Sequence, residues 1–185
     1  MDGWKKKRTV MHRYNVTAGI YDMRYAEEQG AKIEAALKHV RFDGNAMILD
    51  VGCGTGILFD YVARKAAMVV GLDISRETLL KAKGRTKNQV NVHLILADAD
   101  NVPLAGKSFN RVFAMTLIQN TPDPDKTLKE IKRVAEDEAF VVVTGLKRVF
   151  SRKGFEQLLA NAGLKIVALK NEALKCYVAV CSKEG

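Results

Sequence analysis

The chain has 185 residues, of which 48% are hydrophobic and 28% are charged. This composition is typical of one globular domain with a sizeable core, and it excludes collagen-like and wholly disordered chains. No apolar run approaches the roughly 20 residues that cross a bilayer, so no membrane partner is expected. The formal net charge of +9 at pH 7 favours a polyanionic partner, and the alternative explanation is a lysine-rich solvated surface.

The first 43 residues are predicted to differ from the remainder of the chain. Residues 1–25 mix basic and aromatic side chains, and we interpret them as an arm. A helix is expected from Glu27 to about His39, because Ile33, Ala36 and Leu37 recur at helical spacing. The predicted division is therefore an N-terminal arm and helix over residues 1–43 and a main domain over residues 44–185.

Strands alternate with helices after residue 44. Strands are expected over residues 46–50, 67–72, 90–97, 111–117 and 139–144, and helices over 57–64, 75–83, 124–134 and 151–162. Residues 165–169 and 175–181 are two more strands, and their short connection predicts an antiparallel pair. The expected fold class is α/β, with a doubly wound, Rossmann-like seven-stranded sheet that is mostly parallel and has an antiparallel last strand.

Three of the expected strands end in a carboxylate, at Asp50, Asp73 and Asp98. In a doubly wound sheet, ligands bind beyond the carboxyl ends of the strands. A loop with glycines at Gly52, Gly54 and Gly56 follows the first carboxylate, in GxGxG rather than dinucleotide-type GxGxxG spacing. A carboxylate before the glycines would repel a pyrophosphate but suits an ammonium or a sulfonium, and S-adenosylmethionine carries both.

The next two carboxylates fit the nucleoside part of such a ligand. Asp73 lies 17 residues after Gly56, close to where a carboxylate binds ribose hydroxyls. Asp98 can accept a hydrogen bond from the adenine amine, with Ile74 and Ala99 as apolar neighbours of the ring. The alternative is that these carboxylates only cap the following helices and that the glycines only form a tight turn.

The segments LDVGCGTG, VVGLDIS and LILADADNVPL resemble the first three motifs of class I S-adenosylmethionine-dependent methyltransferases. The resemblance covers about residues 44–181 and is nearest to the group that contains the ubiquinone- and menaquinone-biosynthesis methyltransferases. It implies that Asp50, Gly52, Cys53, Gly54 and Gly56 line the methionine end of the cofactor. The segment with Tyr21, Asp22 and Tyr25 is similar to the N-terminal segment that covers the cofactor in that group.

The resemblance also places the methyl acceptor at the end of the fourth strand. Asn120 and a carbonyl held by Pro122 could accept hydrogen bonds from an exocyclic amine, and both are the expected catalytic residues. The segment is loosely similar to the Asn-Pro-Pro-aromatic motif of amino-methylating enzymes, but Thr121 departs from that motif. The alternative is a turn in which Asp123 caps the next helix.

The main substrate hypothesis is RNA, either ribosomal or transfer RNA, with cytidine N4 of ribosomal RNA as the specific candidate. Tyr14 and Tyr25 could contact an extruded base, and Lys147 and Arg148 could neutralise phosphates. Three alternatives remain open: a small-molecule methyltransferase, a protein methyltransferase, and a non-catalytic subunit that docks on RNA or on a partner protein. The cysteines and histidines show no metal-ligand spacing, so no metal is expected, and the lack of a CxxC pair indicates a reduced, cytoplasmic setting.

Overall fold

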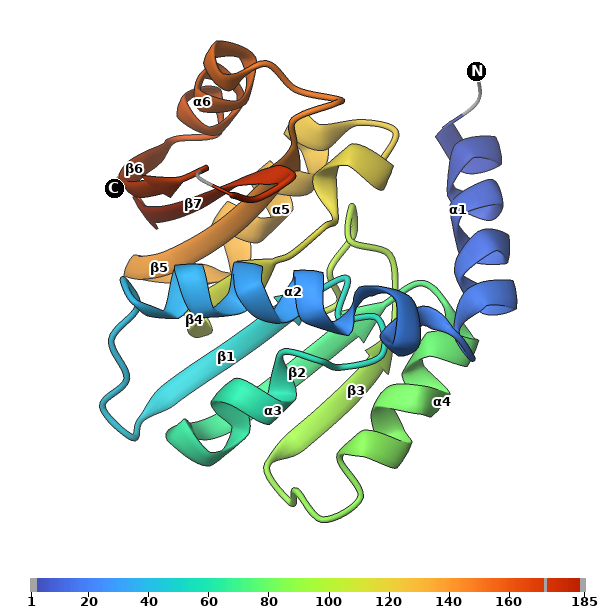
Figure 1. Cartoon of the computed structure of the whole chain (residues 1–185). Coiled ribbons are helices and arrows are strands. Elements are labelled where there is room, and N and C mark those ends of the chain that lie inside the picture. Colours follow the sequence, from blue (N-terminus) through green and yellow to red (C-terminus); the bar gives the residue numbers. More distant parts are fainter. Residues whose placement is uncertain (1–2, 172, 184–185) are drawn as a thin grey trace.

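The computed structural model describes residues 3–171 and 173–183, which form a sheet with helices on both faces (Figure 1). The helices are α1 (Gly3–Thr17), α2 (Tyr21–Leu37), α3 (Phe59–Val62), α4 (Arg76–Arg85), α5 (Pro124–Val134) and α6 (Arg152–Asn161). The strands are β1 (Ala46–Val51), β2 (Ala66–Asp73), β3 (Val92–Leu96), β4 (Phe109–Ala114), β5 (Ala135–Leu146), β6 (Leu164–Lys170) and β7 (Cys176–Lys183).

The seven strands follow the order β3-β2-β1-β4-β5-β7-β6. Neighbouring strands run parallel except that β7 is antiparallel to both β5 and β6. This arrangement confirms the predicted fold class. The order reverses between β1 and β4, and the crevice at such a switch point is where doubly wound sheets bind ligands.

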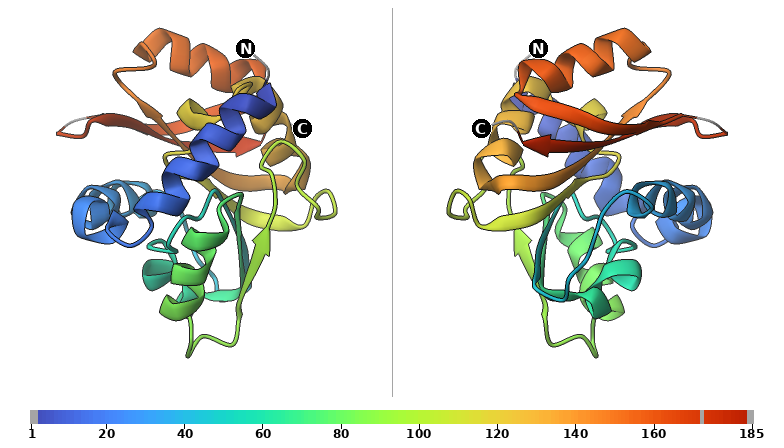
Figure 2. Two further views of the ribbon diagram at one scale, coloured as in Figure 1. Left: turned by 90° about the vertical axis from the view of Figure 1, so that its right-hand side faces the viewer. Right: turned by 90° about the vertical axis from the view of Figure 1, so that its left-hand side faces the viewer.

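Two apolar clusters fill the space between the sheet and its helices. Ile33 of α2, Phe59 of α3 and Leu79 of α4 pack on one face. Leu128 of α5 and Phe155 of α6 pack on the other face, and Figure 2 shows these two layers edge-on. The central strands therefore lie between two apolar layers, which fixes the positions of their carboxyl ends.

The prediction of an arm is wrong for the described part of residues 1–25. Residues 3–17 form α1 and residues 21–25 begin α2, which starts at Tyr21 rather than at Glu27. Lysine, arginine and methionine are good helix formers, but the segment lacks the apolar periodicity that signals a packed helix. None of the residues of α1 is buried, and Figure 1 shows the helix beside the carboxyl ends of the strands.

Several expected boundaries also shift. The fourth strand ends at Ala114 rather than at residue 117, because Thr116 adopts a left-handed backbone conformation with φ of 58°. The fifth strand begins at Ala135, directly after α5, and the third is shortened to Val92–Leu96. The helix expected over 57–64 shortens to α3 and one 3₁₀ turn. No helix in the described ranges is both long and apolar enough to cross a membrane.

Candidate cofactor and acceptor site

A pocket opens at the carboxyl ends of β1, β2 and β4, under α1. It is lined by residues that the sequence analysis assigned to the site, namely Asp50, Gly52, Cys53, Gly54, Asp73, Ile74, Asp98, Ala99, Tyr14, Tyr21, Asn120 and Pro122. Side chains that the sequence analysis did not single out complete the wall, among them Lys7, Gln29 and Thr116. Long-range folding thus brings the three acidic strand ends together with the N-terminal helices.

Four predicted site residues lie outside the lining of this pocket. Gly56 has a φ of 79°, and a Cβ there would lie 2.6 Å from the Phe59 ring, so this glycine serves the turn and its packing. Tyr25 is 41% exposed and packs against the Tyr21 ring. The third, Lys147, donates a hydrogen bond to the carbonyl of Asn171. Arg148 follows it in the same exposed turn.

We call residues 52–56 the glycine loop. Backbone hydrogen bonds hold this loop at the end of β2. The backbone N–H groups of Gly52 and Cys53 both donate to the carbonyl of Leu72, at 2.7 Å and 3.0 Å. Gly52 and Gly54 have φ values of 76° and 56°, a conformation that favours glycine. This loop therefore exposes backbone rather than side chains to the pocket, and a ligand can approach it closely.

Asp50 is the group that best reports what the pocket binds. Its side chain is 2% exposed, and its Oδ1 has no hydrogen-bond partner in the described structure. Burial and the neighbouring charge of Asp73 raise the pKa of this carboxyl to about 8. A buried carboxylate without a partner is costly, and a ligand cation beside it would offset that cost. The residues present thus fit the ammonium of S-adenosylmethionine.

Asp73 connects the end of β2 to the glycine loop. Its Oδ2 accepts from the backbone N–H of Gly54 at 2.9 Å, and its Oδ1 accepts from Ser75 N at 2.8 Å. Burial raises the pKa of Asp73, while these backbone hydrogen bonds act in the opposite direction. Oδ1 also accepts from the Thr78 hydroxyl at 3.3 Å. An ionised carboxylate offers about four lone-pair sites, so Oδ2 can still accept from a ribose hydroxyl.

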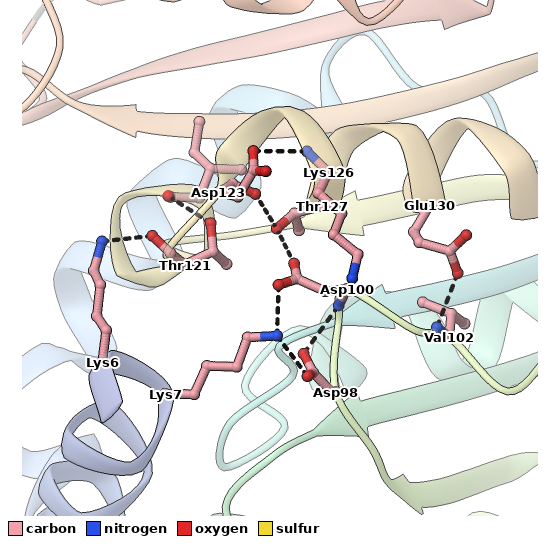
Figure 3. A network of polar contacts seen from close by, with 11 residues as sticks. Lys6, Lys7, Asp98, Asp100, Val102, Thr121, Asp123, Lys126, Thr127 and Glu130 are labelled. Carbon is pink, nitrogen blue, oxygen red and sulfur yellow. Dashed lines mark hydrogen bonds and ion pairs between the residues drawn. The ribbon is translucent and has the colours of Figure 1, made fainter. Parts of the chain in front are cut away.

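Asp98, at the predicted adenine end, has a partner that sequence reasoning missed. The ammonium of Lys7 on α1 lies 2.6 Å from Asp98 Oδ2 and 2.5 Å from Asp100 Oδ2 (Figure 3). Burial lowers the pKa of Lys7, but hydrogen bonds to the two carboxylates outweigh it and raise the pKa above its usual value. The only sequence signal was the basic run at residues 5–8.

The other end of the pocket is built from phenols, amides and a hydroxyl. Asn120 Nδ2 donates to the Tyr14 hydroxyl at 3.2 Å and to the carbonyl of Thr116 at 2.8 Å. Gln29 Nε2 donates to the Tyr21 hydroxyl at 3.2 Å. Burial raises the pKa of both tyrosines, so both phenols stay protonated at neutral pH. Tyr21 was a predicted site residue, whereas the contribution of Gln29 from α2 to this wall was not predicted.

Comparison with known proteins agrees with this geometry. A family model described as a methyltransferase domain matches residues 49–143. Malonyl-[acyl-carrier protein] O-methyltransferase of Marinomonas is 29% identical, over 77% of this chain and 53% of its own. Demethylmenaquinone methyltransferase of Staphylococcus saprophyticus is 28% identical, over 76% of this chain and 64% of its own. Magnesium protoporphyrin IX methyltransferase from Synechocystis with bound SAM superimposes with a TM-score of 0.77 at 16% identity, covering 97% of both chains.

The fold, the glycine loop and the acidic strand ends define a class I S-adenosylmethionine-dependent methyltransferase. The chain belongs to the methyltransferase domain family whose model matches it, and the predicted cofactor, S-adenosylmethionine, is that of the class. The chain spans about half the length of several curated relatives that it matches.

Proposed function

We propose that this protein transfers a methyl group from S-adenosylmethionine to a small-molecule acceptor. The observation that carries the proposal is Asp50, a buried carboxyl without a hydrogen-bond partner, next to a glycine loop that presents bare backbone. A carboxyl so placed is stable in its charged form only beside a cation. The named activities of the relatives support the same chemistry.

When bound, S-adenosylmethionine supplies a methyl carbon that is already activated by a positively charged sulfur. The chain then has to hold and align the reactants and to exclude water. Asp50 and the glycine loop would hold the amino-acid end, Asp73 the ribose, and Ile74 with Ala99 the adenine. Tyr14, from α1, forms part of the wall that separates the acceptor end from solvent.

The side chains at the acceptor end indicate how the acceptor reacts. The described lining residues there offer phenol, amide and hydroxyl groups, whereas the carboxylates lie at the cofactor end. Protonated phenols at Tyr14 and Tyr21 can donate hydrogen bonds and orient an acceptor, but they cannot remove a proton at neutral pH. The acceptor we propose therefore attacks with a lone pair that is free at neutral pH.

The contacts of the basic residues favour a small acceptor over RNA. Lys6 donates to the carbonyl of Thr121 at 2.6 Å, and Arg13 donates to Asn120 Oδ1 at 2.8 Å. Lys7 pairs with two carboxylates. These three cations of α1 thus bind the rim of the pocket, whereas Lys5 and Arg8 of the same helix are exposed. The RNA interpretation stays a prediction that rests on the net charge, on the basic and aromatic N-terminal segment and on the basic residues around Lys147.

A transfer assay tests the proposal. The protein is incubated with S-adenosylmethionine labelled in its methyl group and with an extract of the source cells, which is then separated into low-mass, RNA and protein fractions. We expect label in the low-mass fraction, and much less label with the Asp50→Asn variant at a cofactor concentration near the wild-type Kd. Label in RNA would establish the alternative. Failure of the wild-type protein to bind S-adenosylmethionine in calorimetry would contradict both interpretations.

A further inference from the structure

We propose that Lys7 is a positioning residue of the cofactor site. Its ion pairs hold α1 closed over the pocket, and product release depends on the opening of these pairs. The inference rests on the proposed function, because it concerns release of the nucleoside product from the same pocket. It assigns a role to a residue outside the matched methyltransferase domain, residues 49–143.

The two carboxylates that Lys7 contacts are held in place by the main body of the protein. Asp100 is 4% exposed, and the Thr127 hydroxyl donates to its Oδ1 at 2.5 Å. Asp98 Oδ1 accepts from the backbone N–H of Asp100 at 3.0 Å. Figure 3 shows the ammonium of Lys7 between these two fixed acids. The Lys7 ammonium thus attracts both carboxylates, Asp98 and Asp100, which are both partly removed from water and would otherwise repel each other.

The attachment of α1 to the body is polar. No residue of α1 is fully buried, and its apolar side chains Val10, Met11 and Tyr14 are only half-buried, so the hydrophobic effect holds this helix less strongly than it holds the core helices. Lys6 and Asn15 add hydrogen bonds to Thr121 and Ser75, at 2.6 Å each. Ion-paired hydrogen bonds are stronger than neutral ones, and the Lys7 side chain is only 14% exposed. We infer that the Lys7 pairs dominate the closure of α1.

This contact lies at the end of the pocket where the adenine is expected. Lys7 and Val10 both line the pocket, so the nucleoside is enclosed between them and the strand ends. Asp98 keeps lone pairs for the adenine amine while it accepts from Lys7. Opening α1 would break the Lys7 pairs, leave Asp98 and Asp100 without their cation and uncover the nucleoside in the same step.

The test measures how fast S-adenosylhomocysteine dissociates, by stopped-flow displacement, from the full-length protein. We expect Lys7→Ala to raise the dissociation rate by at least about tenfold, the effect of losing a charge-assisted contact. Lys7→Arg restores the charge and should bring the rate to within about threefold of the wild type. Arg8→Ala removes one positive charge from an exposed position of the same helix, and it should leave the rate unchanged.

Hydrogen exchange separates the proposed role from a general loss of structure. Amide exchange in Lys7→Ala should increase in residues 3–17 and stay unchanged in the strands.

A wild-type dissociation rate in Lys7→Ala would overturn the inference, whether or not α1 exchanges faster. Equal acceleration by Arg8→Ala would also overturn it, because the effect would then follow net charge rather than the ion pairs. If the wild-type protein binds no S-adenosylhomocysteine at all, the proposed function fails as well.

Discussion

The pocket is made of two parts that are held by different forces. Its floor, formed by β1, β2, β4 and the glycine loop, rests on strands whose apolar side chains are buried on both faces of the sheet. Its cap, helix α1, has no buried residue and is attached by hydrogen bonds and ion pairs. The floor can therefore hold a ligand in one geometry, while the cap can open without disturbing the core.

Removing an aromatic side chain from the floor should have the largest effect. Phe113 on β4 is 1% exposed, and Phe113→Ala should lower the free energy of unfolding by about 3–5 kcal/mol, through lost burial and the cavity that remains. Urea unfolding followed by circular dichroism measures the change.

A matched pair of valines tests the comparison directly. Val112→Ala deletes two methyl groups from buried β4, and Val10→Ala deletes the same groups from α1. We expect a loss of about 2 kcal/mol in the floor and less than about 1 kcal/mol in the cap. Equal losses would mean that α1 unfolds together with the core, which contradicts the division into floor and cap.

The next prediction concerns cofactor binding, and it depends on the negative charge of Asp50 in the floor. Asp50→Asn should weaken S-adenosylmethionine binding roughly 10- to 150-fold, the equivalent of about 1.5–3 kcal/mol for a hydrogen bond to a charged group. Calorimetry measures the affinity. Unchanged affinity would remove Asp50 from the cofactor site.

The pKa of Asp50 gives this prediction a pH dependence with a definite sign. Because the pKa is about 8 in the free protein, the carboxyl is mostly protonated at pH 7 and must lose its proton to bind an ammonium. The wild-type affinity should rise with pH until about pH 8 and then level off. Binding at pH 7 should release about one proton, measured in buffers of different ionisation enthalpy. Asp50→Asn should show neither effect.

The raised pKa of Asp50 also makes the folding stability depend on pH. A carboxyl whose pKa is raised in the folded state binds a proton more tightly there than in the unfolded chain, so its contribution to stability falls as pH rises. For Asp50 this fall extends from about pH 4, near the ordinary value for aspartate, to about pH 8. Bound cofactor should reduce the loss, because its ammonium stabilises the charged carboxylate.

The floor could be predicted from sequence because its signals are local. Each acidic residue lies within two residues of the end of an apolar strand, and the three glycines lie within seven residues of Asp50. Parallel strands bring their carboxyl ends to one edge, so local patterns alone predicted that Asp50, Asp73 and Asp98 would meet. The family comparison supports the cofactor assignment, whereas the roles of individual residues remain predictions.

The cap could not be predicted, because its contacts join distant positions without a periodic pattern. Lys7 and Asp98 are 91 residues apart, and Arg13 and Asn120 are 107 apart. From the sequence, the basic residues of α1 could only be described as part of a basic and aromatic arm. Their pairing with the pocket rim depends on where α1 lies, and no local rule gives that position.

Among the effects on ligand binding and turnover, the smallest is expected at Asn120, where the cap meets the floor. Its amide donates to Tyr14 of α1 and to the carbonyl of Thr116 at the end of β4, and its Oδ1 accepts from Arg13. Asn120→Ala should lower kcat about tenfold, or 1.4 kcal/mol, because the acceptor wall loses its alignment. The affinity for S-adenosylmethionine should change less than about threefold, since the ligands of the amino-acid end are untouched.

The isosteric variant Asn120→Asp shows which half of the amide matters. It keeps an oxygen for Arg13 but removes the donors to Tyr14 and Thr116. If the donors align the wall, this variant should lose as much turnover as Asn120→Ala. Full turnover in Asn120→Asp would instead assign the function to the oxygen, which is the group that a methylated amine would need. Full turnover in Asn120→Ala would exclude the side chain from catalysis and leave it only as a contact between cap and floor.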